Sequence, residues 1–279
     1  MIARYGSTEL YCLSNYLGIQ QGWKNAIGFV MGTAEPWWWA PEKVNNMRDY
    51  SGFFPLTEKN ITAFCKQMLK DTHELDILAS WLPKETNLKK ELVSVPRIFL
   101  PYLEPWYAEK PWTRALEGKR IVVVHPFSEL IEKQYSQNRI RLFSNPDILP
   151  SFQLRTVKAV QSLGGSNSLG FTTWFDALAW MRKEIDKEDY DIALIGCGAY
   201  GFPLAAHVKR LGKQAVHMGG ALQLLFGIKG NRWEDPMYGV REWGLQKGLY
   251  TKMFNEFWLK PGESTQPANA QQVEGACYW

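Results

Sequence analysis

Two short clusters in this 279-residue chain have residue types and spacing that suit phosphate binding. The first is Gly196-Cys-Gly-Ala-Tyr-Gly201, which matches the pattern GxGxxG. Glycines in such a turn let a phosphate approach backbone amides, and a helix that follows adds its positive N-terminus. A dinucleotide site also needs an acid about 20 residues further on, to hold a ribose. The next apolar run ends at His217-Met-Gly-Gly220 without one. A nucleotide or nucleotide-sugar phosphate is therefore favoured, with a glycine turn needed only for packing as the alternative.

The second cluster is Arg4-Tyr-Gly-Ser-Thr-Glu9, beside the start of an apolar helical pattern. The carboxylate of Glu9 could bind a divalent cation or act as a base. The guanidinium of Arg4 could hold a phosphate. A capping arrangement at a helix start explains the same residues without any function, so both interpretations stay open.

Two further groups carry chemistry that the sequence leaves undecided. His125 follows a β-branched run, where it could donate a hydrogen bond to a diphosphate or relay a proton. A structural histidine is the competing interpretation, and the same two options apply to His217. Within Asn231-Arg-Trp-Glu-Asp235, the arginine could pair with phosphate and the acids could bind a metal. A solvated charged turn fits that segment as well.

The elements that must position these residues follow from the pattern after residue 118. Apolar, β-branched runs predict strands, and amphipathic runs predict helices. The predicted strands are Arg120–His125, Leu154–Val160, Asp191–Ile195 and Gln214–Met218, and the helices are Ser128–Gln137, Thr173–Ile185 and Phe202–Leu211. Such alternation predicts a parallel sheet in a layered, Rossmann-like α/β fold with flanking helices. Ligands of these sheets bind at the carboxyl ends of the strands.

The first 117 residues have a different character, being rich in Trp and Pro. We expect them to form a motif-bearing, aromatic-rich helical region packed on a core of residues 118–279, or to share one continuous domain with it. Helical patterns cover Leu10–Leu17 and Ile61–Leu82, with a loop at 35–39 between them. The polar segment 260–270 is expected to run along the surface, and the Gly164-Gly165 pair to form a loop.

Composition narrows the possible partners and location. The chain has 13 Trp, 12 Tyr and 14 Phe, an excess that indicates large aromatic packing or rings that line a groove for sugars or bases. A net charge of +4 without a Lys/Arg block suits an anionic small ligand and argues against nucleic acid. The four cysteines show neither metal nor disulfide spacing. No apolar run is long enough for a transmembrane helix or a signal peptide. We expect a soluble cytoplasmic protein, with peripheral attachment to the inner face of a membrane left open.

Both clusters resemble signatures of the GT-D type glycosyltransferases, bacterial enzymes with a Rossmann-like core that are found among genes for surface polysaccharides and glycoproteins. The run from Arg4 to Glu9 resembles their Arg-x-Gly-Asp-x-Glu opening. The run from Asp191 to Gly220 resembles their second signature of strand, glycine turn, helix and strand. The chain also looks like a group of proteins encoded in polysaccharide clusters, through the phrases Val124-His-Pro-Phe127, Gln134-Tyr135, Leu222-Gln-Leu-Leu-Phe-Gly227 and Cys277-Tyr-Trp279.

This resemblance implies transfer of a sugar from a nucleotide-sugar donor, with uridine diphosphate as the expected carrier, to a glycan, glycoprotein or lipid-linked acceptor. On this hypothesis Glu9 and His125 serve catalysis. Trp37, Trp38 and Trp39 would stack on the acceptor. The expected donor site consists of Arg4, Gly6, Ser7, Gly198, Ala199, Tyr200, Gly201, Gly219 and Gly220.

One departure from the family pattern concerns the metal. In GT-D enzymes an Asp-x-Glu pair serves Mn²⁺ or Mg²⁺ and the donor diphosphate. Here Ser7 stands where the Asp should be, and a hydroxyl is a poor substitute for an anionic ligand. Glu9 then binds metal with another partner, or acts as a base while Arg4 and helix amides neutralise the diphosphate.

A second departure is that the three residues before Arg4 leave little room for the strand that normally precedes the motif.

Two other function classes stay open. The first is a non-catalytic binding or assembly protein of a polysaccharide pathway. The second is an adenosylmethionine-dependent methyltransferase, whose usual ribose-binding acid is absent here.

Overall fold

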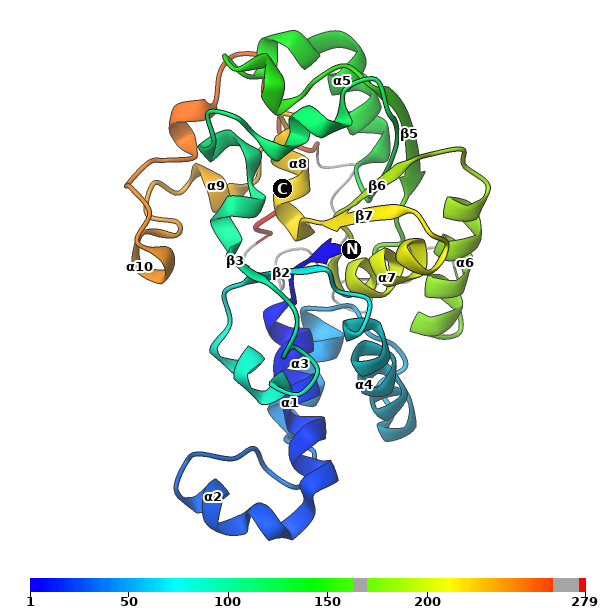
Figure 1. Cartoon of the computed structure of the whole chain (residues 1–279), viewed down its shortest axis with the longest axis vertical. Helices are drawn as coiled ribbons and strands as arrows, with labels where there is room; N and C mark the ends of the chain where they lie inside the picture. The colour runs from blue at the N-terminus through cyan, green and yellow to red at the C-terminus, as the bar shows by residue number, and fades with distance from the viewer. Residues whose placement is uncertain (163–169, 263–275) are drawn as a thin grey trace.

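A sheet of seven parallel strands organises the chain (Figure 1). The computed structural model describes residues 1–162, 170–262 and 276–279. The strand order is β3-β2-β1-β7-β6-β4-β5. The strands are β1 (Ile2–Ala3), β2 (Ile77–Ser80), β3 (Arg97–Phe99), β4 (Arg120–His125), β5 (Gln153–Lys158), β6 (Ile192–Ile195) and β7 (Gln214–His217). The predicted α/β fold with a parallel sheet is therefore confirmed.

The order in which strands are added to the sheet reverses around β4. Strand β5 is added on one side of β4, and the chain then returns to add β6 and β7 on the other side. Helices after successive strands lie on opposite faces at such a point, which leaves a crevice beyond the carboxyl ends of the strands. The crevice here lies beyond β4, which ends at His125, and β6, which ends just before the glycine turn.

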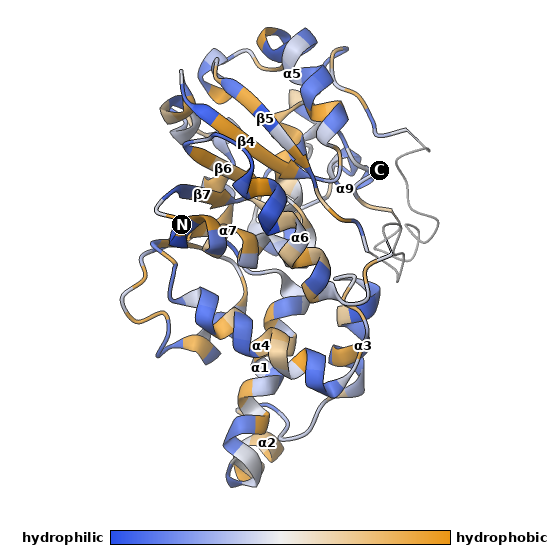
Figure 2. Cartoon of the chain, turned by 90° about the vertical axis from the view of Figure 1, so that its right-hand side faces the viewer, coloured by the Kyte–Doolittle hydropathy of each residue, from blue (hydrophilic) through white to orange (hydrophobic). Residues whose placement is uncertain are grey.

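Consecutive apolar residues in the central strands are explained by burial on both faces. Val122 and Val124 of β4 belong to one hydrophobic core, whereas Ile121 and Val123 belong to the other. Parallel strands covered on both sides need this continuous apolar pattern rather than an alternating one. Figure 2 shows the result as uninterrupted hydrophobic colouring along β4 and β6.

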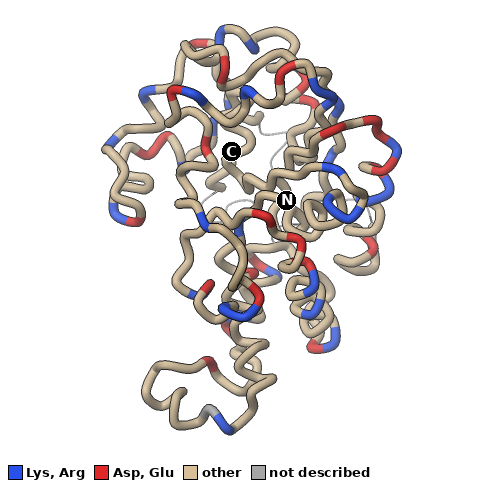
Figure 3. Tube along the Cα trace, in the orientation of Figure 1, with Lys and Arg blue, Asp and Glu red and all other residues tan. Residues whose placement is uncertain are grey.

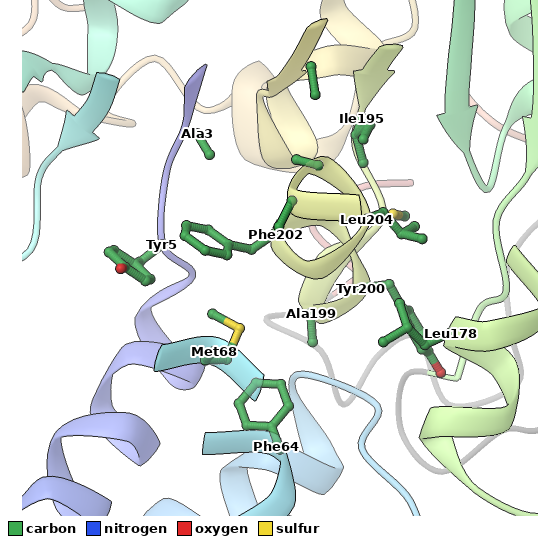
Figure 4. Packing of buried hydrophobic residues seen from close by; sticks show 14 of the residues in the cluster. Ala3, Tyr5, Phe64, Met68, Leu178, Ile195, Ala199, Tyr200, Phe202 and Leu204 are labelled. Carbon is green, nitrogen blue, oxygen red and sulfur yellow. The ribbon is translucent and has the colours of Figure 1, made fainter. Parts of the chain in front are cut away.

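Helices cover both faces of the sheet. Side chains from α1 (Ser7–Gln21), α4 (Glu58–Thr72), α6 (Trp174–Asp186) and α7 (Gly201–Arg210) form the first core. In that core Tyr5 stacks on Phe202 of α7, with ring centroids 4.7 Å apart (Figure 4). The second core is covered by α5 (Ser128–Leu142), α8 (Leu222–Leu225) and α9 (Asn231–Glu234). The remaining helices are α2 (Ala26–Val30), α3 (Pro41–Asp49) and α10 (Val240–Trp243).

The structure corrects several expectations about individual elements. The apolar run 61–82 is not one helix, because α4 ends at Thr72 and the run continues as β2. Strand β1 has two residues, yet it pairs with β2 and β7 in the middle of the sheet. Strands on both sides of residue 117 thus share one sheet. Helix α5 continues to Leu142, and Phe127, not Ser128, is its N-cap. The Gly164-Gly165 loop and most of the polar segment 260–270 lie outside the described residues.

Candidate functional site

A cavity of about 210 Å³ lies at the carboxyl ends of the strands. Residues that follow or end each of the seven strands contribute to its lining, from Arg4 after β1 to Met218 after β7. The predicted site residues that line it are Arg4, Gly6, Ser7, Glu9, His125, Gly198, Ala199, Tyr200, Gly219 and Gly220. The two clusters found in the sequence, about 190 residues apart, therefore meet in one cavity.

Arg4 leaves β1 and extends its side chain into this cavity. Its guanidinium carbon lies 4.7 Å from the ring centre of Trp81, and a Cβ added at Gly219 would lie 3.1 Å from Nη1. Its guanidinium donates no hydrogen bond to any of the described residues. Burial lowers the pKa of Arg4, and the nearby Tyr278 and Glu9 offset part of this effect. Arg232 also lines this partly buried cavity, and two arginines together favour an anionic ligand.

Glu9 occupies the first turn of α1, where a negative charge is favoured by the helix dipole. Its carboxylate folds back over the N-cap residue Gly6, so that a Cβ added at Gly6 would lie 1.7 Å from Oε2. Ser51 Oγ donates a hydrogen bond to Oε1 over 2.9 Å. Gly6 is thus required for the position of Glu9, and Ser7 lies beside it at the cavity wall.

The two histidines at the cavity are buried and hold their protons on different nitrogens. Burial lowers the pKa of each to about 3, so both rings are neutral near pH 7. The backbone N–H of Phe127 donates to Nδ1 of His125 over 3.0 Å, which leaves the proton of that ring on Nε2. Nδ1 of His217 lies 3.1 Å from the carbonyl oxygen of Ile195, which can only accept. His125 therefore offers a donor at Nε2, and His217 an acceptor.

The three glycines of the GxGxxG turn are needed for different structural reasons. A Cβ at Gly196 would lie 2.6 Å from the carbonyl oxygen of Gly219, and one at Gly201 would lie 2.1 Å from Cε1 of His217. Both glycines permit close packing, and Gly201 does not line the cavity. Gly198 differs, because its φ is 56° and nothing lies within 4 Å of an added Cβ. Its backbone amide precedes α7, where helix N–H groups lack intrahelical partners.

Glu104 is a functional candidate that sequence reasoning missed. It lines the cavity with 8% of its surface exposed, and its Oε2 accepts a hydrogen bond of 2.9 Å from the hydroxyl of Tyr250. Burial raises the pKa of Glu104 to about 7. The available signal was an isolated carboxylate in the aromatic run Pro101-Tyr-Leu-Glu-Pro-Trp-Tyr107. An acid within such a run is either solvated or buried with a partner.

Tyr278 and Trp279, at the end of the sequence, form part of the cavity wall. Gln223 donates from Nε2 to the carbonyl oxygen of Tyr278 over 3.1 Å, and the amide of Asn231 donates to that of Trp279 over 3.1 Å. The Tyr278 ring lies against Gly220, where an added Cβ would be 2.2 Å from Cε1. The guanidinium carbon of Arg232 is 4.8 Å from the centre of that ring. An aromatic and cationic wall therefore faces the glycine backbone.

Trp37, Trp38 and Trp39, expected to stack on an acceptor, do not line this cavity. Trp37 and Trp38 contact Phe29 of α2, whereas Trp39 stacks on Tyr16 of α1. Three adjacent tryptophans in the sequence do not indicate which part of the fold their loop packs against. The aromatic rings at the cavity come instead from distant segments, including Trp81, Tyr238, Trp243, Tyr278 and Trp279.

The described residues of the cavity include no dedicated set of protein ligands for a metal. In the described ranges, no three His, Cys, Asp or Glu side chains come together as metal ligands. The acidic residues among the described cavity lining are Glu9 and Glu104, and each has one oxygen in a hydrogen bond to a hydroxyl. Ser7 adds only a weak neutral oxygen ligand. Positive charge comes from Arg4 and Arg232 instead.

Comparison of the chain with protein-family models, curated proteins and solved structures found no match. Within the residues that the structure describes, none of the helices combines the length and the apolar character needed to cross a lipid bilayer.

Proposed function

We propose that this protein is a glycosyltransferase of GT-D type that uses a nucleotide-diphosphate sugar, with a uridine diphosphate sugar as the expected donor. The observation that supports this most is the position of Arg4. Its guanidinium, which donates no hydrogen bond to any described residue, shares one cavity with the open backbone of Gly198 and the carboxylate of Glu9. These are the groups that a diphosphate and a reacting sugar need, at the strand ends where α/β proteins bind ligands.

In this proposal the donor diphosphate lies between the glycine turns and the arginines. Charge-assisted hydrogen bonds from Arg4 and Arg232 would neutralise the negative charge that grows on the leaving group. The Nε2–H of His125 would donate to a phosphate oxygen, because the neutral ring has no free lone pair for a proton. The cavity is smaller than the roughly 300–1,000 Å³ of typical small-molecule sites, so part of the donor would extend beyond it.

The reaction would form a bond between an acceptor oxygen and the anomeric carbon of the sugar, and break the bond from that carbon to the diphosphate. The acceptor hydroxyl must lose its proton to a carboxylate. Glu9 was identified for this role from the sequence, and Glu104 is the second candidate because a base with a pKa near 7 accepts a proton efficiently at neutral pH. No step is assigned to a metal, since no three metal-ligating side chains come together among the described residues.

The test is to incubate the purified protein with a panel of nucleotide sugars, with and without Mn²⁺, and to measure both binding and release of the nucleoside diphosphate. Binding of at least one donor is expected, and Arg4→Met should abolish it. Arg155→Met is the matched control, because that arginine is 62% exposed and outside the cavity lining. Failure to bind any donor would sink the proposal. Binding without turnover, in the presence of candidate acceptors, would favour a non-catalytic binding protein.

A further inference from the structure

The segment from Gly18 to Trp39 forms an arm that projects from the end of α1 (Figure 1). It contains the last turn of α1, a 3₁₀ turn (Gly22–Asn25), α2 and a returning loop. The loop is fastened to α1 by Asn15, whose Nδ2 donates to the carbonyl oxygens of Pro36 and Trp38 over 3.2 and 2.9 Å. Because the first turn of α1 lies at the cavity, the arm extends away from the proposed site.

The arm has an ordered tip with its own small aromatic cluster. Phe29 contacts Trp37 and Trp38 edge to face, with ring centroids 5.6 and 5.0 Å apart. The amides of Thr33 and Ala34 both donate to the carbonyl oxygen of Gly28. The tryptophan loop therefore supports α2.

This internal packing leaves four large apolar side chains of the tip uncovered. Trp23, Ile27, Val30 and Met31 are 75%, 77%, 83% and 71% exposed. Trp23 lies in the 3₁₀ turn, Ile27 and Val30 lie in α2, and Met31 follows it, so all four come from one short stretch of the tip. Single exposed apolar residues are ordinary, whereas four large ones together at a projecting tip mark a contact surface.

The charges around this tip identify the surface that it would contact. Lys24 is the one charged residue between Glu9 and Glu35 in the sequence, and it is exposed. Glu35 is buried and forms ion pairs with Lys43 and Lys84, so it presents no free negative charge. Figure 3 shows the arm as almost free of charged residues. A tip-to-tip pair of copies would bring two Lys24 side chains together, whereas anionic headgroups would neutralise them.

We propose that this tip docks on an anionic lipid surface. Ile27, Val30 and Met31 enter the acyl boundary, Trp23 lies at the headgroup level, and Lys24 extends to the lipid phosphates. The protein thereby attaches peripherally, with the sheet and the cavity held off the membrane by the length of α1. This inference stands on the arm alone and does not depend on the proposed sugar transfer.

The test is co-sedimentation of the full chain with vesicles of phosphatidylcholine alone or mixed with phosphatidylglycerol. We expect binding to the mixed vesicles. The double variant Ile27→Ser/Val30→Ser should bind them at least about tenfold more weakly, because each change removes an aliphatic side chain from the acyl boundary. The matched control is Val93→Ser/Ile140→Ser, which alters two apolar residues that are 84% and 74% exposed elsewhere. It should bind as the wild type does.

The variant Lys24→Glu tests the contribution of charge while the apolar side chains stay in place. This variant should lose the preference for vesicles that contain phosphatidylglycerol. Circular dichroism melts of all variants report on folding. No binding of the wild type to either vesicle, or equal binding by the Ile27/Val30 double variant, would overturn the proposal. Light scattering that shows a wild-type dimer and a monomeric Ile27/Val30 variant would assign the tip to a second copy of the chain instead.

Discussion

Replacing Gly198 by alanine tests the position of the donor phosphates, because the change puts one methyl group into the open side of the glycine turn. Gly198 has a φ of 56° and open space around an added Cβ. Gly212, at the far end of α7, has a φ of 77° and equally open space, but it does not line the cavity. The two substitutions therefore impose a similar backbone strain, and only one of them alters the proposed site.

The expected magnitudes follow from this geometry. An alanine held at left-handed φ costs roughly 1–2 kcal/mol, so both variants should melt lower by about 2–4 °C per kcal/mol. In Gly198→Ala the methyl group also keeps a phosphate from the backbone amides. Loss of one charge-assisted hydrogen bond, worth about 1.5–3 kcal/mol, weakens binding by roughly 10- to 100-fold.

Isothermal titration with uridine diphosphate, together with thermal melts, measures both effects. Gly212→Ala should bind as tightly as the wild type after its fraction folded is taken into account. The reasoning is refuted if Gly198→Ala binds the nucleotide with wild-type affinity, since the phosphates then lie elsewhere in the cavity. Equal weakening in both variants would show a general effect of strain in α7 and not an effect of the site.

Three further predictions concern protonation and metal. Burial raises the pKa of Glu104 from 4.5 to about 7, so its stabilising contribution is complete below the lower value and is lost as the pH rises through the higher one. Melts of Glu104→Gln should accordingly show a smaller fall in stability between about pH 5 and about pH 8 than wild-type melts. For His125 and His217, burial lowers the pKa from 6.5 to about 3. The contribution of each neutral ring to the free energy of unfolding is therefore complete above pH 6.5 and is lost as the pH falls toward about 3. Nitrogen-15 NMR should find the proton on Nε2 of His125 and Nδ1 of His217, and doubly protonated rings at about pH 5 would contradict the burial argument. Finally, a chelator should leave nucleotide binding unchanged, because arginines supply the positive charge, and a strict requirement for Mn²⁺ would show that Glu9 has metal-binding partners that the described residues do not reveal.

Local sequence patterns were sufficient for the half of the sheet after residue 118. Strands such as β4 and β6 are buried on both faces, and this demands the continuous apolar runs that the sequence displays. Thr173 begins α6 with a capping box to Asp176, a signal that is also local. The other half has no such signal. Strands β1 and β3 are only two and three residues long, and β2 continues the apolar run of a helix.

The sequence predicts that the glycine turn follows a buried strand and opens a helix, because spacing and residue type act within a few residues. The distant groups that meet at this turn are brought together by the packing of the whole chain. Arg4 reaches Gly219 because β1 pairs with β7, and Glu104 reaches the same cavity from a segment with no regular pattern. Trp37 and Trp38 lie on the arm, where they contact Phe29. The ends of parallel strands converge at one edge of the sheet, and that convergence is a property of strand order, which no local pattern encodes.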